Sequence, residues 1–179
     1  ILEGSKAFSK DLMKKYHIPT AGYETFDSAD EALHYLETAK LPIVLKADGL
    51  ALGKGVLICN TLEEAKAGVK SLMLDKQFGA AGSRIFVEEF MTGREVSVLS
   101  FVDGETIRIM TSAQDHKRAK DGDQGLNTGG MGTFSPSPFY TEEVDEFCQK
   151  YIYQATVDAM KTEGRPFKGI IFFGLMLTE

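Results

Sequence analysis

The segment that decides the fold reads Pro42-Ile43-Val44-Leu45-Lys46-Ala47-Asp48-Gly49-Leu50-Ala51-Leu52-Gly53-Lys54-Gly55-Val56-Leu57-Ile58-Cys59. Two apolar runs, 43–47 and 56–59, predict strands on either side of a glycine-rich loop. Backbone N–H groups of such a loop can wrap phosphates, and a flexible loop between antiparallel strands suits a flap that closes over a nucleotide. A plain hairpin, with glycines only for turn geometry, is the alternative.

The glycine-rich loop is not a Walker phosphate loop. That motif needs four residues between its glycines and a hydroxyl residue that leads into a helix. Here three residues separate Gly49 from Gly53, Gly55 stands at the hydroxyl position, and a strand follows. Any phosphate contact must therefore have a different geometry.

Lys46 closes the first apolar strand. Burying an ammonium group is costly unless an anion meets it. We therefore expect Lys46 to face an acidic side chain or a phosphate. The alternative is a lysine whose stem lies on apolar surface while its ammonium reaches water.

Helices and strands are predicted on both sides of this segment. Ser28 with Glu31, and Thr61 with Glu64, form capping boxes that open helices near 29–39 and 62–74. An Asp103-Gly104 turn joins two strands of an antiparallel sheet. The other expected elements are a helix over 5–16, strands at 21–26, 85–89, 96–102, 106–110 and 170–177, a ligand loop at 112–140 and a helix over 144–159.

The segment Val87-Glu88-Glu89-Phe90-Met91-Thr92-Gly93-Arg94-Glu95 combines what a purine nucleoside needs. Acids end an apolar strand, an apolar pair follows, and another acid comes after a turn. A purine edge can take one backbone C=O and one backbone N–H between apolar walls, and a carboxylate can hold a ribose diol. An exposed hairpin turn with solvated acids is the alternative.

These features, in this order, resemble the ATP-grasp superfamily, whose two lobes sandwich ATP. In that resemblance Lys46 and Lys54 touch the phosphates, and Glu95 takes the ribose. The backbone of 89–91 holds adenine, and Glu88 lies beside it. The resemblance implies catalytic roles for the two lysines and a nucleotide site made by Lys46, Gly53, Lys54, Gly55, Val56, Glu88, Glu89, Phe90, Met91 and Glu95.

Two longer strings narrow the family: Thr111-Ser112-Ala113-Gln114-Asp115-His116-Lys117-Arg118 and Asn127-Thr128-Gly129-Gly130-Met131-Gly132-Thr133-Phe134-Ser135-Pro136. They are similar to the signatures of the phosphoribosylamine–glycine ligases, also called glycinamide ribonucleotide synthetases. The similarity implies that Asp115 meets an ammonium, that Lys117 and Arg118 meet phosphate or carboxylate, and that the backbone near Gly130 meets an anion. The implied substrate residues are Asp115, His116, Lys117, Arg118, Asn127, Thr128, Gly129 and Gly130. Without the flanking strings these charges are typical of a solvated loop.

The resemblance implies an α+β fold with antiparallel sheets in two lobes that sandwich ATP. The smaller lobe would span residues 17–90, and the larger, incomplete lobe 91–179 together with the helix 5–16. The implied reaction moves the γ-phosphoryl group of ATP to glycine and then joins the glycyl group to 5-phosphoribosylamine. The family's ligands for magnesium (or manganese) would lie beyond Glu179, and the family's N- and C-terminal domains would be missing. We therefore expect the isolated chain to bind adenine nucleotide weakly without completing the reaction.

Composition argues against several other classes of protein. The 179 residues carry a formal net charge of -6, which is unlike a nucleic-acid-binding protein. No apolar run approaches the roughly 18 residues of a membrane span, and no signal peptide is recognisable, so the cytoplasm is expected. Cys59 and Cys148 stand in apolar patterns typical of buried thiols. Two other functions remain open: another ATP-grasp carboxylate–amine ligase, and a non-catalytic nucleotide-binding module.

Overall fold

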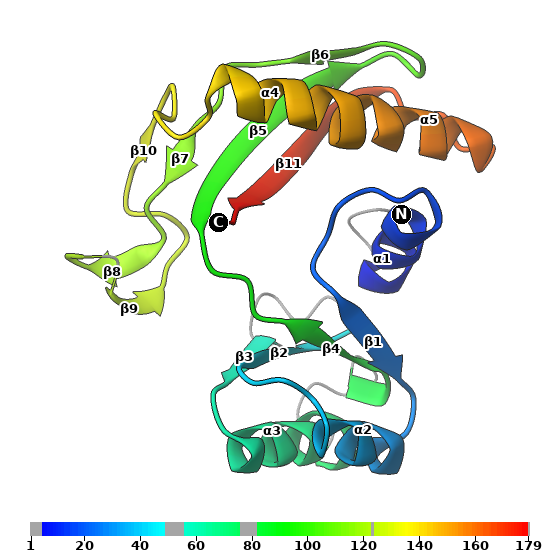
Figure 1. Ribbon diagram of the computed structural model, residues 1–179, viewed down its shortest axis with the longest axis vertical. Helices are drawn as coiled ribbons and strands as arrows, with labels where there is room; N and C mark the ends of the chain where they lie inside the picture. The colour runs from blue at the N-terminus through cyan, green and yellow to red at the C-terminus, as the bar shows by residue number, and fades with distance from the viewer. Residues whose placement is uncertain (1–4, 49–55, 76–81, 123, 179) are drawn as a thin grey trace. The chain divides into compact units, whose positions relative to one another are not determined.

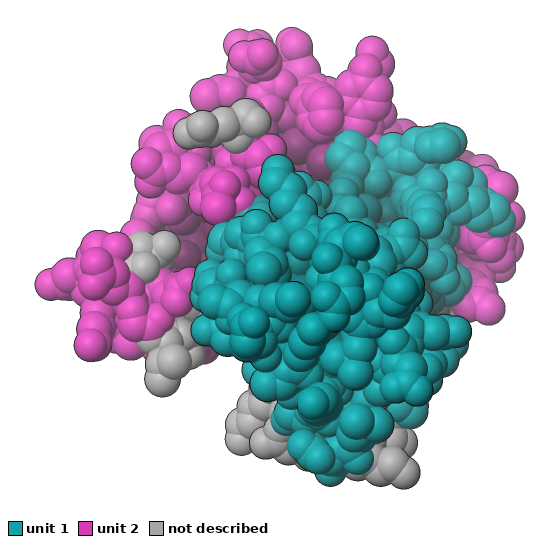
Figure 2. Space-filling model, turned by 60° about the horizontal axis from the view of Figure 1, so that its bottom comes forward, with its two compact units in different colours: residues 1–91 teal, residues 92–179 magenta. Residues whose placement is uncertain are grey.

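The computed structural model describes residues 5–48, 56–75, 82–122 and 124–178. The chain forms two compact units, residues 1–91 and 92–179, which Figure 2 distinguishes by colour. Among the described helices, none combines the length and the apolar character that crossing a membrane requires.

The first unit is a sheet with two helices on one face (Figure 1). Its strands form an antiparallel sheet in the order β1-β4-β2-β3. The elements are α1 (Lys6–Lys15), β1 (Tyr23–Phe26), α2 (Ala29–Leu36), β2 (Ile43–Ala47), β3 (Val56–Cys59), α3 (Leu62–Val69), the π-helical η1 (Lys70–Leu74) and β4 (Ile85–Glu89). The core between sheet and helices contains Ala32, Leu36, Ile43, Leu45, Ala47, Cys59, Ala65, Val69, Leu72, Met73, Ile85 and Val87.

The pleat of β2 and β4 separates their side chains onto two faces. Alternate residues of β2, such as Leu45, enter the core beneath α2 and α3, so Lys46 belongs to the opposite face. The register pairs Val44 with Glu88 and Lys46 with Phe86. Lys46 and Glu88 are therefore diagonal neighbours on the face away from α2 and α3.

The predicted helix starts are confirmed by hydrogen bonds at the N-caps. Ser28 Oγ accepts from the backbone N–H of Glu31. Thr61 and Glu64 form a reciprocal capping box, in which the side chain of each residue accepts a hydrogen bond from the backbone N–H of the other. The helix predicted over 62–74 is present, with its last turn π-helical as η1.

Helix α1 falls in the first compact unit, residues 1–91. Its assignment to the larger ATP-grasp lobe stays a prediction. Lys10 Nζ donates to the carbonyl oxygen of Ala21, and Lys6 Nζ donates to that of Ala47. These bonds attach α1 to the segment before β1 and to the end of β2, which helical periodicity alone does not reveal.

The second unit is a three-stranded antiparallel sheet covered on one face by a long helix (Figure 1). Its elements are β5 (Arg94–Val102), β6 (Ile107–Ile109), β7 (Gln114–Asp115), β8 (Arg118–Lys120), β9 (Gln124–Asn127), β10 (Thr133–Phe134), α4 (Glu142–Cys148), the π-helical η3 (Gln149–Tyr153), α5 (Gln154–Thr162) and β11 (Gly169–Leu177). The sheet order is β11-β5-β6. The core beneath α4, η3 and α5 contains Val96, Val98, Val102, Ile107, Cys148, Tyr153 and Val157.

The segment 112–140 is more ordered than the irregular loop expected from the sequence. It contains four short strands, which pair as β7 with β10 and as β8 with β9. An isolated bridge between Ser97 and Ala113 ties the segment to β5. The expectation of an irregular loop was therefore wrong, because strands of two to four residues carry too little periodicity to be recognised.

Both cysteines are buried thiols, as predicted. Burial raises the pKa of Cys59 and of Cys148 above the ordinary thiol value. Both side chains therefore stay protonated near neutral pH and act as small apolar residues of the two cores.

Candidate functional site

Lys46 faces a buried carboxylate, as the sequence predicted. Its Nζ lies 2.7 Å from Glu88 Oε2, and Glu88 is 4% exposed. The same oxygen lies 3.5 Å from Lys10 Nζ. One carboxylate oxygen, on the sheet face away from α2 and α3, thus contacts two ammonium groups.

The two lysines of this cluster differ in their access to solvent. The side chain of Lys46 is 28% exposed, whereas that of Lys10 is 10% exposed. Burial lowers the pKa of Lys10; Glu88 opposes this shift, and the positive charge of Lys46 adds to it. Two ammonium groups on one carboxylate leave an excess positive charge, and Lys46 is the lysine that can present it to a ligand.

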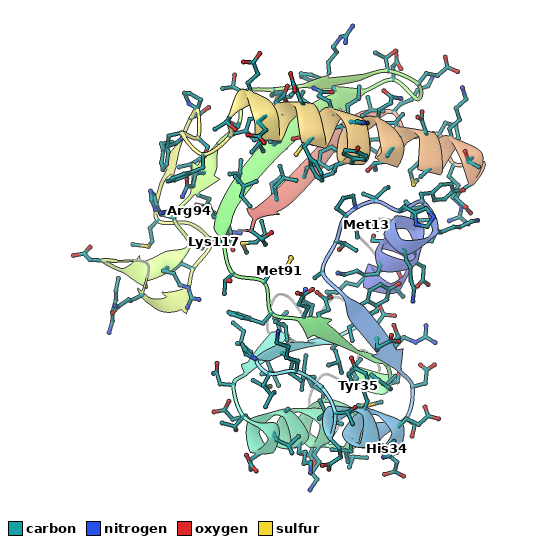
Figure 3. The ribbon with its side chains drawn as sticks, in the orientation of Figure 1. Met13, His34, Tyr35, Met91, Arg94 and Lys117 are labelled. Atoms are coloured by element: carbon teal, nitrogen blue, oxygen red, sulfur yellow. The ribbon has the colours of Figure 1, made fainter. Side chains whose placement is uncertain are left out.

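The end of β4 leaves backbone groups available beside this cluster. Glu89 is tied back to Gly22, because its N–H donates to Gly22 O at 2.9 Å and its Oε2 accepts from Gly22 N at 3.2 Å. No backbone hydrogen bond joins Phe90 or Met91 to another described residue. Figure 3 marks Met91 on the connection from β4 to β5. Free N–H and C=O groups between apolar side chains are what an adenine edge requires.

Glu95 lies at the start of β5 in the second unit and is held by an ion pair. Lys117 Nζ is 2.7 Å from Glu95 Oε2, and both side chains are partly exposed. The neighbouring Arg94 stacks its guanidinium 4.3 Å from the centre of the Phe139 ring. Figure 3 shows Arg94 and Lys117 near the first residues of β5. An exposed ion pair is worth little free energy, so a ligand hydroxyl can replace Lys117 at Glu95 at small cost.

Six of the eight predicted substrate residues lie in two neighbouring segments of the second unit, 115–117 and 128–133. The carbonyl oxygen of Lys117 accepts from both the N–H and the hydroxyl of Thr128, at 2.7 and 2.8 Å. His116 N donates to Gly132 O, and Asp115 pairs with Thr133 in the β7–β10 ladder. These bonds bring residues 115–117 against residues 128–133.

Other predicted site residues lie outside the clusters around Glu88, Glu95 and Gly130. Arg118 donates to the carbonyl oxygen of Gly125 within the β8–β9 hairpin, and Asn127 pairs with Arg118 in that ladder. Val56 is the exposed first residue of β3. The predictions for Gly53, Lys54 and Gly55 lie outside the described residues.

Gly130 is required by the conformation of its backbone. Its φ is +122°, and an added Cβ would lie 2.9 Å from Asp115 Oδ1. Gly130→Ala is therefore expected to destabilise the second unit by about 1–2 kcal/mol and to displace Asp115. Urea unfolding followed by circular dichroism, with hydrogen exchange over 114–134, measures both effects.

Gly129→Ala is the matched control for Gly130→Ala. A Cβ at Gly129 meets no atom within 4 Å, and the φ of Gly129 is not in the left-handed region. This variant should unfold within about 0.5 kcal/mol of the wild type. Equal losses in the two variants would contradict the assigned role of Gly130.

Sequence reasoning missed Lys10. In α1 only Lys10 and Leu12 are buried. A lysine among the lysines of an amphipathic helix is typical of a solvated face, and its burial depends on β1 and β4, which come later in the chain. No sequence signal separated Lys10 from Lys14 or Lys15.

The described parts of the chain contain no group of three His, Cys, Asp or Glu side chains that could hold a metal ion. Two described carboxylates of the candidate nucleotide site are instead engaged by lysines, Glu88 by Lys46 and Glu95 by Lys117, and that of Glu89 accepts from the N–H of Gly22. These residues therefore do not by themselves form a magnesium site.

Comparison with known proteins identifies the family to which the chain belongs. Residues 4–179 match the family described as phosphoribosylglycinamide synthetase, ATP-grasp (A) domain. The chain belongs to this family. The match covers both units of this ATP-grasp domain and confirms the α+β ATP-grasp fold that the sequence predicted.

Individual relatives of this ATP-grasp domain agree with the family match. The phosphoribosylamine–glycine ligase of Pasteurella multocida is 48% identical over 176 residues, which cover 98% of this chain and 41% of that ligase. A bifunctional purine biosynthetic protein of Schizosaccharomyces pombe is 50% identical over 177 residues, with 99% of this chain and 22% of that protein covered. The crystal structure of phosphoribosylamine–glycine ligase from Thermotoga maritima matches with a TM-score of 0.90 at 34% identity, covering 98% of this chain and 44% of that one. The chain thus spans less than half the length of these relatives.

Proposed function

We propose that this chain is the ATP-binding part of a cytoplasmic phosphoribosylamine–glycine ligase. The observation that carries the proposal is the family match over residues 4–179, whose lysines and acids form the clusters described above. In the whole enzyme the carboxylate of glycine attacks the γ-phosphorus of ATP, and ADP leaves. The amine of 5-phosphoribosylamine then attacks the glycyl phosphate, phosphate leaves, and an amide bond forms.

The chain's own residues bind and orient the nucleotide in this proposal. Lys46 and Lys54 neutralise phosphate charge, which is the main requirement of phosphoryl transfer. The free backbone groups of Phe90 and Met91 hold the adenine edge, and Glu95 accepts hydrogen bonds from the ribose hydroxyls. A divalent cation, magnesium or manganese, supplies further positive charge at the phosphates of the whole enzyme.

The segment around Gly130 takes the two remaining substrates in this proposal. Asp115 is suited to an ammonium group, and Lys117 and Arg118 are suited to phosphate or carboxylate. Backbone hydrogen bonds hold residues 115–117 against residues 128–133, so Asp115 and Lys117 lie beside the bare backbone of Gly129-Gly130. Such an arrangement suits a small amino acid and a phosphorylated amine.

A chimeric ligase tests the proposal for the whole reaction. The corresponding 176 residues of the Pasteurella multocida ligase, 48% identical, are replaced by this chain. We expect ADP release that requires both glycine and 5-phosphoribosylamine, with no stimulation by alanine or serine. Folded chimera that releases ADP with another amino acid, or with none, would refute the assignment.

Glu95→Gln is expected to weaken the binding of ATP and of adenosine alike. The amide keeps the shape of the side chain but loses the charge that strengthens hydrogen bonds to the ribose, so the affinity for each ligand falls by about tenfold. Isothermal titration calorimetry with both ligands measures this. Glu105→Gln, at an exposed acid of the same unit paired with Lys161, is the control and should bind both ligands as the wild type does. Unchanged adenosine affinity in Glu95→Gln would remove the ribose role.

A further inference from the structure

Lys10 is buried on α1 although it carries a charge. It is 8% exposed, and its Nζ lies 2.9 Å from Thr20 Oγ1, 3.2 Å from Ala21 O and 3.5 Å from Glu88 Oε2. The centre of the Tyr23 ring lies 5.3 Å from the same nitrogen. Lys10 therefore has an oxygen partner for each of its three N–H groups. Its ammonium is occupied by the protein and is not available to a ligand.

The contact of Lys10 that bears on the site is the one to Glu88. Glu88 Oε2 is also the oxygen to which Lys46 donates at 2.7 Å. Glu88 projects from β4 on the sheet face away from α2 and α3, and Figure 1 shows α1 on that side of the sheet. Glu88 is therefore held between a lysine from α1 and a lysine from β2.

Lys10, Lys46 and Glu88 together leave one excess positive charge; Glu89, whose charge also acts on Lys10, is engaged by the N–H of Gly22. With Lys46 as its only partner, the buried Glu88 carboxylate would form a neutral pair, and the attraction of Lys46 for a phosphate would be reduced. Lys10 supplies a second positive charge to the same oxygen. The charge of Lys46 is then in excess, at the only lysine of the pair whose side chain is more than a quarter exposed.

We propose that Lys10 is a positioning residue for the polyphosphate of the nucleotide. It fixes the Glu88 carboxylate that orients Lys46, and it compensates the charge of that carboxylate so that Lys46 can neutralise phosphate. Lys10 touches no ligand and acts through Glu88 and Lys46. The proposal rests on the proposed ATP-binding function of this site.

A double-mutant cycle in the 179-residue chain tests this role, with ATP and adenosine as ligands in isothermal titration calorimetry. Lys10→Met should lower the affinity for ATP by about fivefold and change that for adenosine by less than about twofold. Lys10→Arg, which keeps the charge, should recover most of the ATP affinity. Lys10→Met combined with Lys46→Met should bind ATP within about twofold of Lys46→Met alone, because Lys10 acts through Lys46.

Lys14→Met is the matched control. Lys14 is an exposed lysine of α1 whose Nζ also lies near the Tyr23 ring, at 5.6 Å, and it has no ion pair to Glu88. Its substitution should leave both affinities unchanged. If Lys10→Met does not fold, Thr20→Val removes one oxygen partner of Lys10 and should lower ATP affinity by about twofold, again without loss for adenosine.

Two results would overturn the proposal and leave the proposed function standing. One is a multiplicative loss in the double variant, which would show that Lys10 and Lys46 act independently. The other is an equal loss of ATP and adenosine affinity in folded Lys10→Met or Thr20→Val, which would indicate a merely structural role. If the wild type does not bind ATP more tightly than adenosine, or if Lys46→Met binds ATP as the wild type does, the proposed function itself fails.

Discussion

Glu88→Ala is expected to destabilise the first unit by about 3–5 kcal/mol, the loss typical of a buried ion pair from which one partner is removed. Glu88 is 4% exposed and contacts Lys46 at 2.7 Å and Lys10 at 3.5 Å. Without it, two ammonium groups lie close together on one face of the sheet, and Lys10 is too buried to be solvated. Urea unfolding followed by far-ultraviolet circular dichroism, with hydrogen exchange of the β2 and β4 amides, measures the loss.

Glu63→Ala provides the comparison within the same unit. Glu63 is an exposed acid in the first turn of α3, so its removal should change the free energy of unfolding by less than about 0.5 kcal/mol. A loss below about 1 kcal/mol in Glu88→Ala would mean that the lysines are solvated without Glu88. Glu88 would then not be required to compensate the charges of Lys10 and Lys46.

Lys46→Met is expected to weaken ATP binding by about thirtyfold, as the loss of one charge-assisted contact to phosphate implies. The affinity for adenosine, which has no phosphate, should change by less than about twofold. The thioether side chain keeps most of the lysine stem, so the loss reflects the ammonium rather than a cavity. Calorimetric titration with both ligands measures the difference.

Lys40→Met is the control for Lys46→Met. Lys40 is an exposed lysine of the same unit, and no ion pair is described for it. It should bind ATP as the wild type does. Equal ATP affinity in Lys46→Met and wild type would instead favour a module that does not use this lysine for phosphate.

The elements with strong local signals could be predicted from the sequence with their bounds. The apolar runs at 43–47 and 56–59 became β2 and β3, and the capping box of Thr61 and Glu64 begins α3. Each of these signals depends on residues within a few positions of one another. Local periodicity and capping chemistry were therefore sufficient.

The segment 112–140 could not be predicted in the same way. Its strands have two to four residues and pair through backbone bonds, such as that from His116 N to Gly132 O. A backbone ladder this short does not require alternating apolar and polar residues, so no side-chain pattern predicts it. The resemblance to a known family located the substrate residues here, whereas their pairing became visible only in three dimensions.

The candidate site was predicted in part. Strand periodicity implied an anionic partner for Lys46, and the structure identifies that partner as Glu88. Lys10 was not predicted because helical periodicity does not report contacts with segments 11 or more residues away, such as its bond to Ala21 and its ion pair with Glu88. Tertiary burial of a charged side chain is the feature that sequence patterns represent least well.

A crystal structure of the chain with a non-hydrolysable ATP analogue would show which side chains meet the nucleotide. We expect Lys46 and Lys54 Nζ to lie within about 3.2 Å of phosphate oxygens and the Glu95 carboxylate oxygens to lie within a similar distance of the ribose hydroxyls. A nucleotide bound with its phosphates away from both lysines, or with its ribose away from Glu95, would refute the proposed ATP site.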